Sequence, residues 1–440
     1  MSRFAALVLF LAGAASGQQP VAPPVAITHV TVIDVRSGAA LPDMTVVVRE
    51  GRIAALDRGG AVPKGAQRLD GRGKFLIPGL WDMHVHLSWT RPSALPVLVA
   101  NGVTGVRDLG SKLGEIDEWR TRIEAGLLVG PRILRVGPIL NGQKFNQFQM
   151  VAGTPDETRG VVRALKEVGV DFIKIHRRMP RDSYFALIEE AKKLGLQVVG
   201  HIPMTVTPEE ASDAGLATIE HVVTPFEGTF SAGLKGGEFL DAVRRFRASG
   251  AEALFARFVK NHNVVTPTLV AYRPQDPAAP DDPHSRYVAL SQRKEWEKQV
   301  PRASAEQFAE SKRTFSEFQE VVRLMHRAGV VLITGTDIAG NRVPGFTLHE
   351  ELEALVQSGL TPAEALRAAT LTPATVVNKG SELGSVETGK LADLVLLDAN
   401  PLDDIRNTQR IAAVVLRGRV FNRRDLDGLL RQAEELASRN

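Results

Sequence analysis

The sequence predicts an α/β protein, a (β/α)8 TIM barrel joined to a small discontinuous β-sandwich domain built from N- and C-terminal segments. Two observations lead to this prediction. Apolar, strand-like runs alternate with helical periodicity through the middle of the chain, which is typical of parallel strands joined by crossover helices. Short runs rich in β-branched residues occur near both ends of the chain, and neither set is large enough to bury a core alone.

The first 17 residues have the layout of a secretory signal peptide, with Arg3, an apolar run and small residues ending near Gly17. The run is too short to span a bilayer as a mature helix, although an uncleaved anchor is the alternative. We therefore expect a secreted or periplasmic protein, with residues 18–24 as a linker. No later stretch reaches the roughly 20 apolar residues of a spanning helix, so we expect no membrane association after signal removal.

The small β-sandwich domain is predicted from residues 25–78 and 381–421, because both stretches show strand-like runs bounded by turn residues. The expected strands cover residues 26–35, 45–56, 392–398 and 411–421. Residues 422–440 are predicted as a helical tail.

The barrel domain is predicted over residues 79–380, because eight strand-like runs separated by helical stretches are the expectation for a (β/α)8 barrel. The helical stretches include residues 156–169 and 183–195. The eight runs cover residues 80–87, 102–110, 132–140, 170–176, 196–202, 217–223, 263–270 and 330–338.

Composition excludes several functions. The chain has 440 residues, of which 44% are hydrophobic and 24% charged, which is typical of a folded protein. Its 54 basic and 50 acidic residues give a net charge of +4 without a dense basic run, so we expect no nucleic-acid partner. There are no cysteines, which excludes disulfides, thiolate metal sites and a cysteine nucleophile.

Polar residues recur where the predicted strands end, which is the end of a barrel that carries catalytic groups. His84 and His86 lie two apart on the first strand, so their side chains share a face. The other members are Lys174, His201, His221 and Asp337 on strands four, five, six and eight. Singly, each could be a hydrogen-bonded core residue; together, six converging polar groups would be costly without a shared cation. The pattern therefore predicts a metal site.

These residues lie in motifs that resemble the amidohydrolase superfamily, and within it the imidazolonepropionase-like and Xaa-Pro dipeptidase (prolidase-like) group. The motifs are PGLWDMHVHL, VDFIKIH, GHIP, IEHV, TGTDIAG, LHEELEALVQSGLTPAEALRAAT and GSVETGKLADLVLLDANPL. The resemblance covers nearly all of residues 26–421. It implies an oligomer and a small-molecule or dipeptide substrate. It is more specific for the superfamily than for the subgroup, since Ile202 and Pro203 depart from the pattern that many members show after the fifth-strand histidine.

The resemblance implies two divalent metal ions, zinc first, with manganese, cobalt or iron nearly as suitable. His84, His86 and Asp337 would hold one ion and His201 and His221 the other. Lys174, carboxylated on its amine, would bridge both together with a hydroxide, and Asp337 would act as general base and acid. The apolar neighbours of Lys174 would lower its pKa and favour that modification.

The implied reaction is hydrolysis of a small amide, such as an Xaa-Pro dipeptide, an N-acyl amino acid or an ochratoxin-like amide. A cyclic-amide hydrolase or deaminase with a single metal is the alternative, and a binding protein without catalysis is a third. Weaker candidates for substrate contact are His176, Arg177, Tyr272 and His349. Each has an equally ordinary structural explanation.

Overall fold

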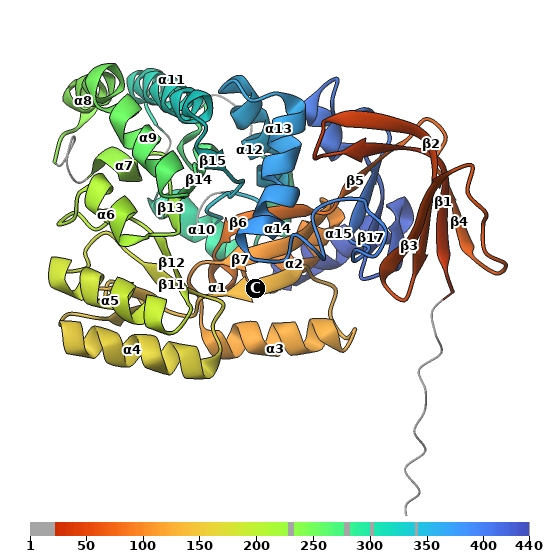
Figure 1. Ribbon diagram of the computed structural model, residues 1–440, viewed down its shortest axis with the longest axis horizontal. Helices are drawn as coiled ribbons and strands as arrows, with labels where there is room; N and C mark the ends of the chain where they lie inside the picture. The colour runs from red at the N-terminus through yellow and green to blue at the C-terminus, as the bar shows by residue number, and fades with distance from the viewer. Residues whose placement is uncertain (1–22, 228–232, 277–281, 300–302, 339–341, 440) are drawn as a thin grey trace, which may run out of the picture.

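The structure, a computed structural model, describes residues 23–227, 233–276, 282–299, 303–338 and 342–439. The predicted signal peptide, and the predicted linker up to residue 22, lie outside these ranges. Figure 1 shows two parts, a large one in which helices surround strands and a smaller sheet at one side. None of the helices in the described ranges is long and apolar enough to cross a bilayer.

The smaller part is one eight-stranded sheet to which both ends of the chain contribute. The strand order is β18-β17-β16-β5-β1-β2-β3, with β4 also paired to β1. The strands are β1 (Val25–Asp34), β2 (Ala39–Arg49), β3 (Arg52–Arg58), β4 (Gln67–Asp70), β5 (Phe75–Pro78), β16 (Leu394–Leu397), β17 (Ile411–Leu416) and β18 (Arg419–Asn422). β16 pairs antiparallel with β5, which joins the two distant segments. The two segments therefore pair within one sheet, whereas the packing of two sheets as a sandwich domain stays a prediction.

The apolar residues of this sheet alternate between two cores. In β16, Leu394 and Leu396 belong to a cluster with β1 and β2 residues, whereas Val395 and Leu397 belong to the large core of the other part. Successive side chains of a strand point to opposite faces, so a strand covered on both faces reads as a continuous apolar run. The run LVLL in β16 is explained by this double burial.

The larger part contains parallel strands in two groups. A three-stranded sheet has the order β6-β7-β8, and a seven-stranded sheet has the order β10-β9-β11-β12-β13-β14-β15. The strands are β6 (Leu80–Val85), β7 (Val103–Asp108), β8 (Arg132–Arg135), β9 (Ile139–Asn141), β10 (Gln149–Val151), β11 (Phe172–Ile175), β12 (Gln197–Gly200), β13 (Thr218–Glu220), β14 (Val264–Thr266) and β15 (Val331–Leu332). Each of the eight predicted runs therefore contains a strand.

Backbone hydrogen bonds connect the two groups of strands at both sides. The amide of Asp171 donates to the carbonyl of Arg135 over 2.8 Å, which links the start of β11 to β8. On the other side, Met83 donates to Thr334 over 3.0 Å, and Asp337 donates to His84 over 2.8 Å. The segment after β15 therefore runs beside β6.

The third predicted strand is wrong in one respect, because residues 132–140 form two strands, β8 and β9, rather than one. Gly137 between them has φ +75, and Pro138 follows it. A left-handed glycine turns the chain out of the extended conformation, and proline has no amide to donate to a ladder. The run continues in β9, which pairs with β10 and β11.

Helices lie between the strands and around them (Figure 1). Four helices, α4, α6, α11 and α13, begin with a capping box such as Thr154 with Glu157. The α-helices are α1 (Leu87–Thr90), α2 (Ala94–Ala100), α3 (Leu113–Glu124), α4 (Pro155–Val168), α5 (Arg181–Lys193), α6 (Pro208–Ala214), α7 (Thr224–Glu227), α8 (Gly236–Ser249), α9 (Ala251–Lys260), α10 (Leu290–Gln299), α11 (Ala305–Ala328), α12 (Phe346–Gln357), α13 (Pro362–Ala368), α14 (Leu371–Val376) and α15 (Arg423–Arg439). The 3-10 helices are η1 (Leu269–Tyr272), η2 (Pro283–Tyr287) and η3 (Ile405–Gln409).

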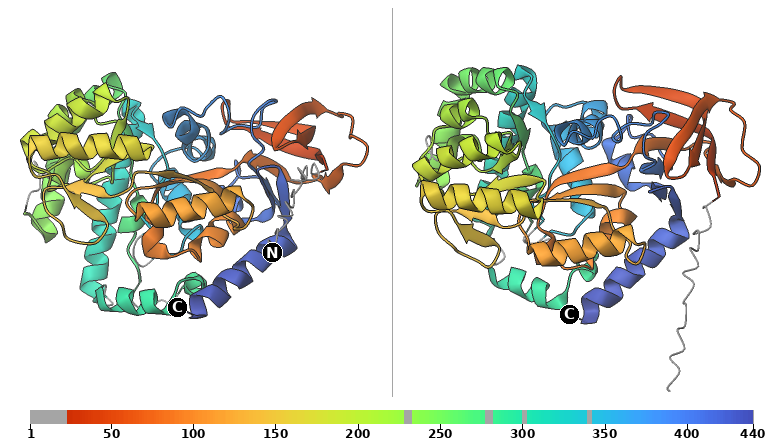
Figure 2. Two further views of the ribbon diagram at one scale, coloured as in Figure 1. Left: turned by 90° about the horizontal axis from the view of Figure 1, so that it is seen from below. Right: turned by 60° about the horizontal axis from the view of Figure 1, so that its bottom comes forward.

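The C-terminal helix α15 returns from the small sheet to the larger part and packs against α2 and η2. Figure 2 shows it running along the outside of the molecule between the two parts. Leu426, Leu429, Ala433 and Ala437 are its buried residues, spaced three or four apart. The helix therefore connects the small sheet to the larger part through its apolar face.

Candidate active site

The structure brings five predicted ligands together at the ends of the parallel strands. His84 lies on β6, and His86 directly precedes α1. His201 and His221 directly follow β12 and β13, and Asp337 follows β15. The ring centroids of His84 and His221 are 4.8 Å apart, and those of His201 and His221 are 4.7 Å apart. The histidines therefore form one continuous cluster.

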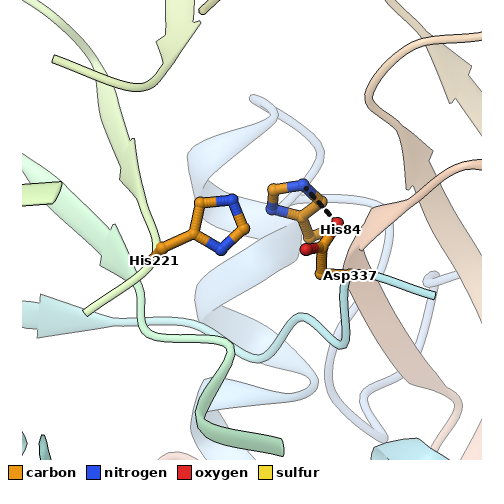
Figure 3. Close-up of side chains that lie close together, drawn as sticks. All are labelled: His84, His221 and Asp337. Carbon is orange, nitrogen blue, oxygen red and sulfur yellow. Dashed lines mark ion pairs between the residues drawn. The ribbon is translucent and has the colours of Figure 1, made fainter. Parts of the chain in front are cut away.

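Asp337 lies between two of the rings. Its Oδ1 is 3.4 Å from Nε2 of His84 and 3.2 Å from Nε2 of His86. The potential ligand atoms of His84, His221 and Asp337 all lie within 4.8 Å of one another. Figure 3 shows the His221 ring and the Asp337 carboxylate on either side of His84.

Unusual backbone conformations occur at this cluster. His221, Thr268 and Asp337 have φ of 72, 48 and 55, a region that non-glycine residues rarely occupy. Such conformations persist only where the surrounding structure holds them, and they concentrate at functional sites. Gly335 is required for packing, because a Cβ there would lie 2.7 Å from the Cβ of His84.

In three of the histidines, Nδ1 lies within hydrogen-bonding distance of a neighbouring group of the protein. Nδ1 of His84 is 2.9 Å from Glu220 Oε2, and Nδ1 of His221 is 2.7 Å from Thr268 Oγ1. Nδ1 of His86 is 3.3 Å from the Gly110 carbonyl. A carboxylate or carbonyl can only accept, so His84 and His86 carry the Nδ1 proton and leave Nε2 with a free lone pair.

Glu220 is itself held by a buried arginine. Nη2 of Arg107 donates to Glu220 Oε1 over 2.7 Å, and the Thr218 hydroxyl donates to the same oxygen over 2.5 Å. Arg107 also donates to the Met83 carbonyl over 2.8 Å, and both charged side chains are completely buried. This ion pair lowers the pKa of Glu220 despite the opposing effect of burial. Glu220 therefore faces His84 as a carboxylate.

Asp82 connects the first strand to the segment that carries Asp337. Its Oδ1 accepts from the amides of Thr336 and His84, over 3.0 and 3.2 Å, and its Oδ2 accepts from the Thr336 hydroxyl over 2.6 Å. Burial raises the pKa of Asp82 to about 7, against these hydrogen bonds. Asp82 thereby fixes the position of Asp337 relative to His84.

Comparison with known proteins decides the family. A sequence profile described as the amidohydrolase family matches residues 75–421, which is most of the chain. The chain belongs to the amidohydrolase family. This amidohydrolase is a hydrolase that acts on amide bonds.

Individual relatives agree with this assignment. Ochratoxinase from Aspergillus niger is 24% identical over 448 aligned positions, covering 86% of this chain and 82% of that protein. Imidazolonepropionase from Geobacillus sp. (strain WCH70) is 43% identical over 72 residues, covering only 16% of this chain and 17% of that protein. Among solved structures, a Bifidobacterium longum protein described as a prolidase has a TM-score of 0.70 at 29% identity. The alignment covers 94% of this chain and 100% of that one.

The amidohydrolase fold is associated with metal ions, and the donor set here fits a metal site. No described residue accepts or donates a hydrogen bond at His84 Nε2, His201 Nδ1 or Lys174 Nζ, although all three atoms are buried. Buried polar atoms are almost always paired, because an unpaired one costs about 1–3 kcal/mol. Buried imidazole nitrogens and a carboxylate are suitable ligands for a divalent cation.

The protonation states also suit metal binding. Burial lowers the pKa of His84 to about 3, with a further contribution from the charge of Lys174. Burial likewise lowers the pKa of His201 and His221, so all three rings are neutral near pH 7. Burial would raise the pKa of Asp337, but its interactions with His84, His86 and His221 lower it. Neutral rings beside an ionised carboxylate are the required ligand forms.

Lys174 lies on β11 and is almost completely buried. Burial lowers its pKa to about 8, against the attraction of Glu220 and Asp337. Its charge contributes to the lowered pKa of His84, His201 and His221, so it lies within electrostatic range of all three. A buried lysine with a lowered pKa has more neutral amine near pH 7 than an exposed one.

Two of the four predicted substrate-contact residues, His176 and Tyr272, lie next to the cluster. The His176 ring is 4.5 Å from the His201 ring, and burial lowers the pKa of His176 to about 3. Arg177 follows it and is partly buried. The Tyr272 ring, on η1, is 6.4 Å from the His221 ring in an edge-to-face arrangement.

The prediction that His349 contacts substrate is corrected by the structure. His349 lies on α12, and its ring is buried between other elements. Nδ1 is 2.9 Å from the Thr408 hydroxyl, and Nε2 is 3.1 Å from the Asn101 carbonyl. Both ring nitrogens are therefore engaged by the protein, and His349 joins α12 to η3 and the end of α2.

Sequence reasoning missed the residues that orient the ligands, namely Glu220, Arg107, Asp82 and Thr268. Two of them carried a signal, because Asp82 lies two residues before His84, and Glu220 precedes His221 in buried strands. A charged residue inside a buried strand requires a partner. Arg107 also stands in an apolar run, but the sequence does not reveal that it pairs with Glu220.

Proposed function

We propose that this chain is an exported, binuclear metal-dependent amidohydrolase that hydrolyses a small amide, either an Xaa-Pro dipeptide or an N-acyl amino acid, including ochratoxin-like amides. The observation that carries the proposal is the buried cluster of neutral histidines and Asp337 beside Lys174, with donor atoms that no described residue satisfies. The names of the relatives, ochratoxinase and prolidase, support this substrate range.

In this proposal His84, His86 and Asp337 would hold one divalent ion, and His201 and His221 would hold the other. Lys174, as an N6-carbamate, would serve both ions, because the carbamate supplies two anionic oxygens where an ammonium supplies none. Zinc suits the donor set first, and manganese, cobalt or iron would also fit. When bound, such ions lower the pKa of a coordinated water and polarise a carbonyl.

The chain's own residues supply the proton transfer and the orientation. Asp337 takes the proton of the attacking water on its carboxylate and returns it to the leaving nitrogen of the amide. Its left-handed backbone and the Asp82 contacts hold the carboxylate against His84 and His86. His176, Arg177 and Tyr272 are assigned to substrate contact.

The domain organisation extends the proposal. Residues 79–380 form a closed (β/α)8 barrel, residues 25–78 and 381–421 form the sandwich domain, and 422–440 form the tail. The hydrogen bonds between Met83 and Thr334 and between Asp171 and Arg135 support closure. Export is assigned to residues 1–17 as a signal peptide and 18–24 as a linker, and the assembly is a homo-oligomer.

The first test is the metal content per chain of protein purified without chelator, together with the Lys174→Ala variant. About two ions per chain are expected, with amide hydrolysis that Lys174→Ala abolishes and that a small carboxylic acid restores. Lys174→Arg is the matched control, because it stays cationic and cannot be carboxylated. Full activity of Lys174→Ala would contradict the bridging role.

A second candidate function is a cyclic-amide hydrolase or deaminase that uses a single metal. The observation in its favour is the compact group of His84, His221 and Asp337, which by itself suffices for one ion. About one ion per chain, together with activity on a panel of heterocycles, would select this alternative. Lys174 argues against it, because a single ion needs no bridging ligand.

A further inference from the structure

Two aromatic rings lie beside the cluster on the side of His86. Trp89 lies on α1, directly after β6, and its ring centroid is 5.7 Å from that of His86. The Phe148 ring is 5.1 Å from the Trp89 ring, with 30° between the planes. We call Trp89 and Phe148 the aromatic wall.

The aromatic wall lies outside the apolar clusters that make up most of the core. Neither ring is a member of the apolar clusters that the described residues form, although Phe148 is only 9% exposed. The two rings therefore pack against each other and beside a predicted ligand histidine rather than inside a core cluster. Aromatic rings stack favourably with other apolar groups at such distances.

The indole of Trp89 has an unused donor. Its Nε1 is buried, and no described residue accepts its hydrogen bond. A buried tryptophan N–H usually has a partner, because leaving it unpaired costs about 1–3 kcal/mol. An acceptor atom that arrives with a ligand would remove this cost.

The backbone holds Phe148 in place. Its amide donates to the Asn146 side chain over 2.9 Å, and its carbonyl accepts from the Ile139 amide over 2.9 Å. The wall therefore joins the loops that follow β6 and β9, at the strand ends that carry the histidines. A fixed ring beside reacting groups is suited to select a substrate rather than to move.

We propose that the aromatic wall binds an aromatic or large apolar group of the amide substrate, and that Trp89 Nε1 donates a hydrogen bond to an acceptor oxygen of the same molecule. This inference rests on the proposed amide hydrolysis and names its substrate class. Trp89 and Phe148 determine specificity, and neither takes part in the proton transfer.

The test compares matched substrates that differ only in the ring. The pairs are N-acetyl-L-phenylalanine with N-acetyl-L-alanine, and N-benzoylglycine with N-acetylglycine. In at least one pair we expect kcat/KM of the metal-loaded enzyme to be about 10- to 100-fold higher for the ring-bearing member, which is the range for burying such a group. Phe148→Ala should remove most of this preference. Trp89→Phe keeps a ring and should lower kcat/KM of both members about tenfold while preserving their ratio.

Phe145→Ala is the matched control. Phe145 lies on the same loop, is 51% exposed and packs against Arg178 rather than Trp89. An equal loss for both members of each pair in Phe148→Ala would overturn the aromatic wall. Unchanged kinetics in Trp89→Phe would overturn the hydrogen bond.

A binding measurement separates the two proposals. Titration with N-acetyl-L-phenylalanine and N-benzoylglycine should change the intrinsic fluorescence of the wild type, and Trp89→Phe should lose this change. Binding without hydrolysis of any amide would overturn the proposed function and support the wall. Hydrolysis without preference for a ring, and without the fluorescence change, would overturn the wall alone.

Discussion

At the scale of single residues, Glu220 pairs with the buried charge of Arg107 and also orients the ring of His84. One of its oxygens is 2.9 Å from Nδ1 of His84, and the other accepts from Arg107 over 2.7 Å. A partner of this kind fixes the tautomer and the ring angle of a ligand histidine. The same carboxylate compensates a completely buried guanidinium, so its charge serves both stability and the site.

We expect Glu220→Gln to weaken metal binding by about 10- to 100-fold, the usual effect of removing such a partner. The variant should also unfold more easily, by about 3–5 kcal/mol, because Arg107 loses its compensating charge. Metal affinity measured by competition with a chromogenic chelator, and thermal unfolding, check both effects.

Thr218→Val is the control for Glu220→Gln, since it removes one buried hydroxyl contact to Glu220 and leaves the carboxylate in place. Its metal affinity should stay close to that of the wild type. Equal metal affinities in wild type and Glu220→Gln would show that His84 is oriented without Glu220.

At the scale of elements, the short helix η1 is held to α12 by a buried carboxylate. Glu351 on α12 accepts from the amides of Leu269 and Val270, over 3.1 and 2.7 Å. η1 follows Thr268, whose hydroxyl is 2.7 Å from His221, and carries Tyr272. Glu351 therefore connects the position of α12 to one side of the active site.

Glu351 also predicts a dependence of stability on pH. Burial raises its pKa to about 8 from 4.5, against the two amide hydrogen bonds. The folded chain then keeps a proton that the unfolded chain releases, so this contribution is complete below pH 4.5 and is lost as the pH rises to about 8. Glu351→Gln is uncharged at every pH, as the protonated carboxyl is.

As the pH is raised from 5 to 8, the unfolding free energy of the wild type should therefore fall relative to that of Glu351→Gln, by up to about 1.4 kcal/mol per pH unit. The melting temperatures of the two proteins, measured across this pH range, check the effect. The comparison cancels other groups that titrate in both proteins. Glu353→Gln, a partly exposed carboxylate on the same helix, is the control. A difference that stays constant with pH would contradict a protonated Glu351.

Elements differ in how far the sequence predicts them. Each of the eight runs predicted as parallel strands contains an observed strand, because a buried parallel strand has a short apolar sequence. The split at Gly137 and Pro138 was readable in principle, since proline interrupts a ladder. By contrast, His349 lies in the LHEEL run that resembles the superfamily, yet its partners are Asn101 and Thr408. Contacts between distant segments depend on packing that one sequence does not display.

The candidate site shows the same division. Histidines and Asp337 at strand ends were predictable, because parallel strands bring their carboxyl ends to one edge. The aromatic wall was only partly predictable: Phe148 lies after the third predicted strand, outside any predicted strand or helix, whereas Trp89 follows His86 in a helical turn that the sequence does not mark. Only the three-dimensional structure shows that no described residue accepts a hydrogen bond from its indole N–H.

At the scale of the whole molecule, β16 and β17 of the small sheet contribute one face to the core of the small sheet and the other face to the core of the larger part. Leu396 belongs to the core of the small sheet, and the adjacent Leu397 belongs to the core of the larger part. The same alternation occurs in β17, where Val414 and Val415 belong to the large and the small core respectively. A substitution that weakens the packing on one face of β16 or β17 is therefore expected to weaken the packing on the other face too.

This arrangement predicts that the two parts unfold together. Leu396 and Leu397 are 3% and 0% exposed, so Leu396→Ala and Leu397→Ala should each cost about 2–5 kcal/mol. Because the strand is common to both cores, each variant should lower the midpoint of one shared transition, followed by calorimetry and by tryptophan fluorescence. Leu127→Ala, at a side chain 74% exposed, should leave the midpoint unchanged. Two separate transitions, with Leu396→Ala shifting only one and Leu397→Ala only the other, would show that the small sheet folds independently of the part that carries the active site.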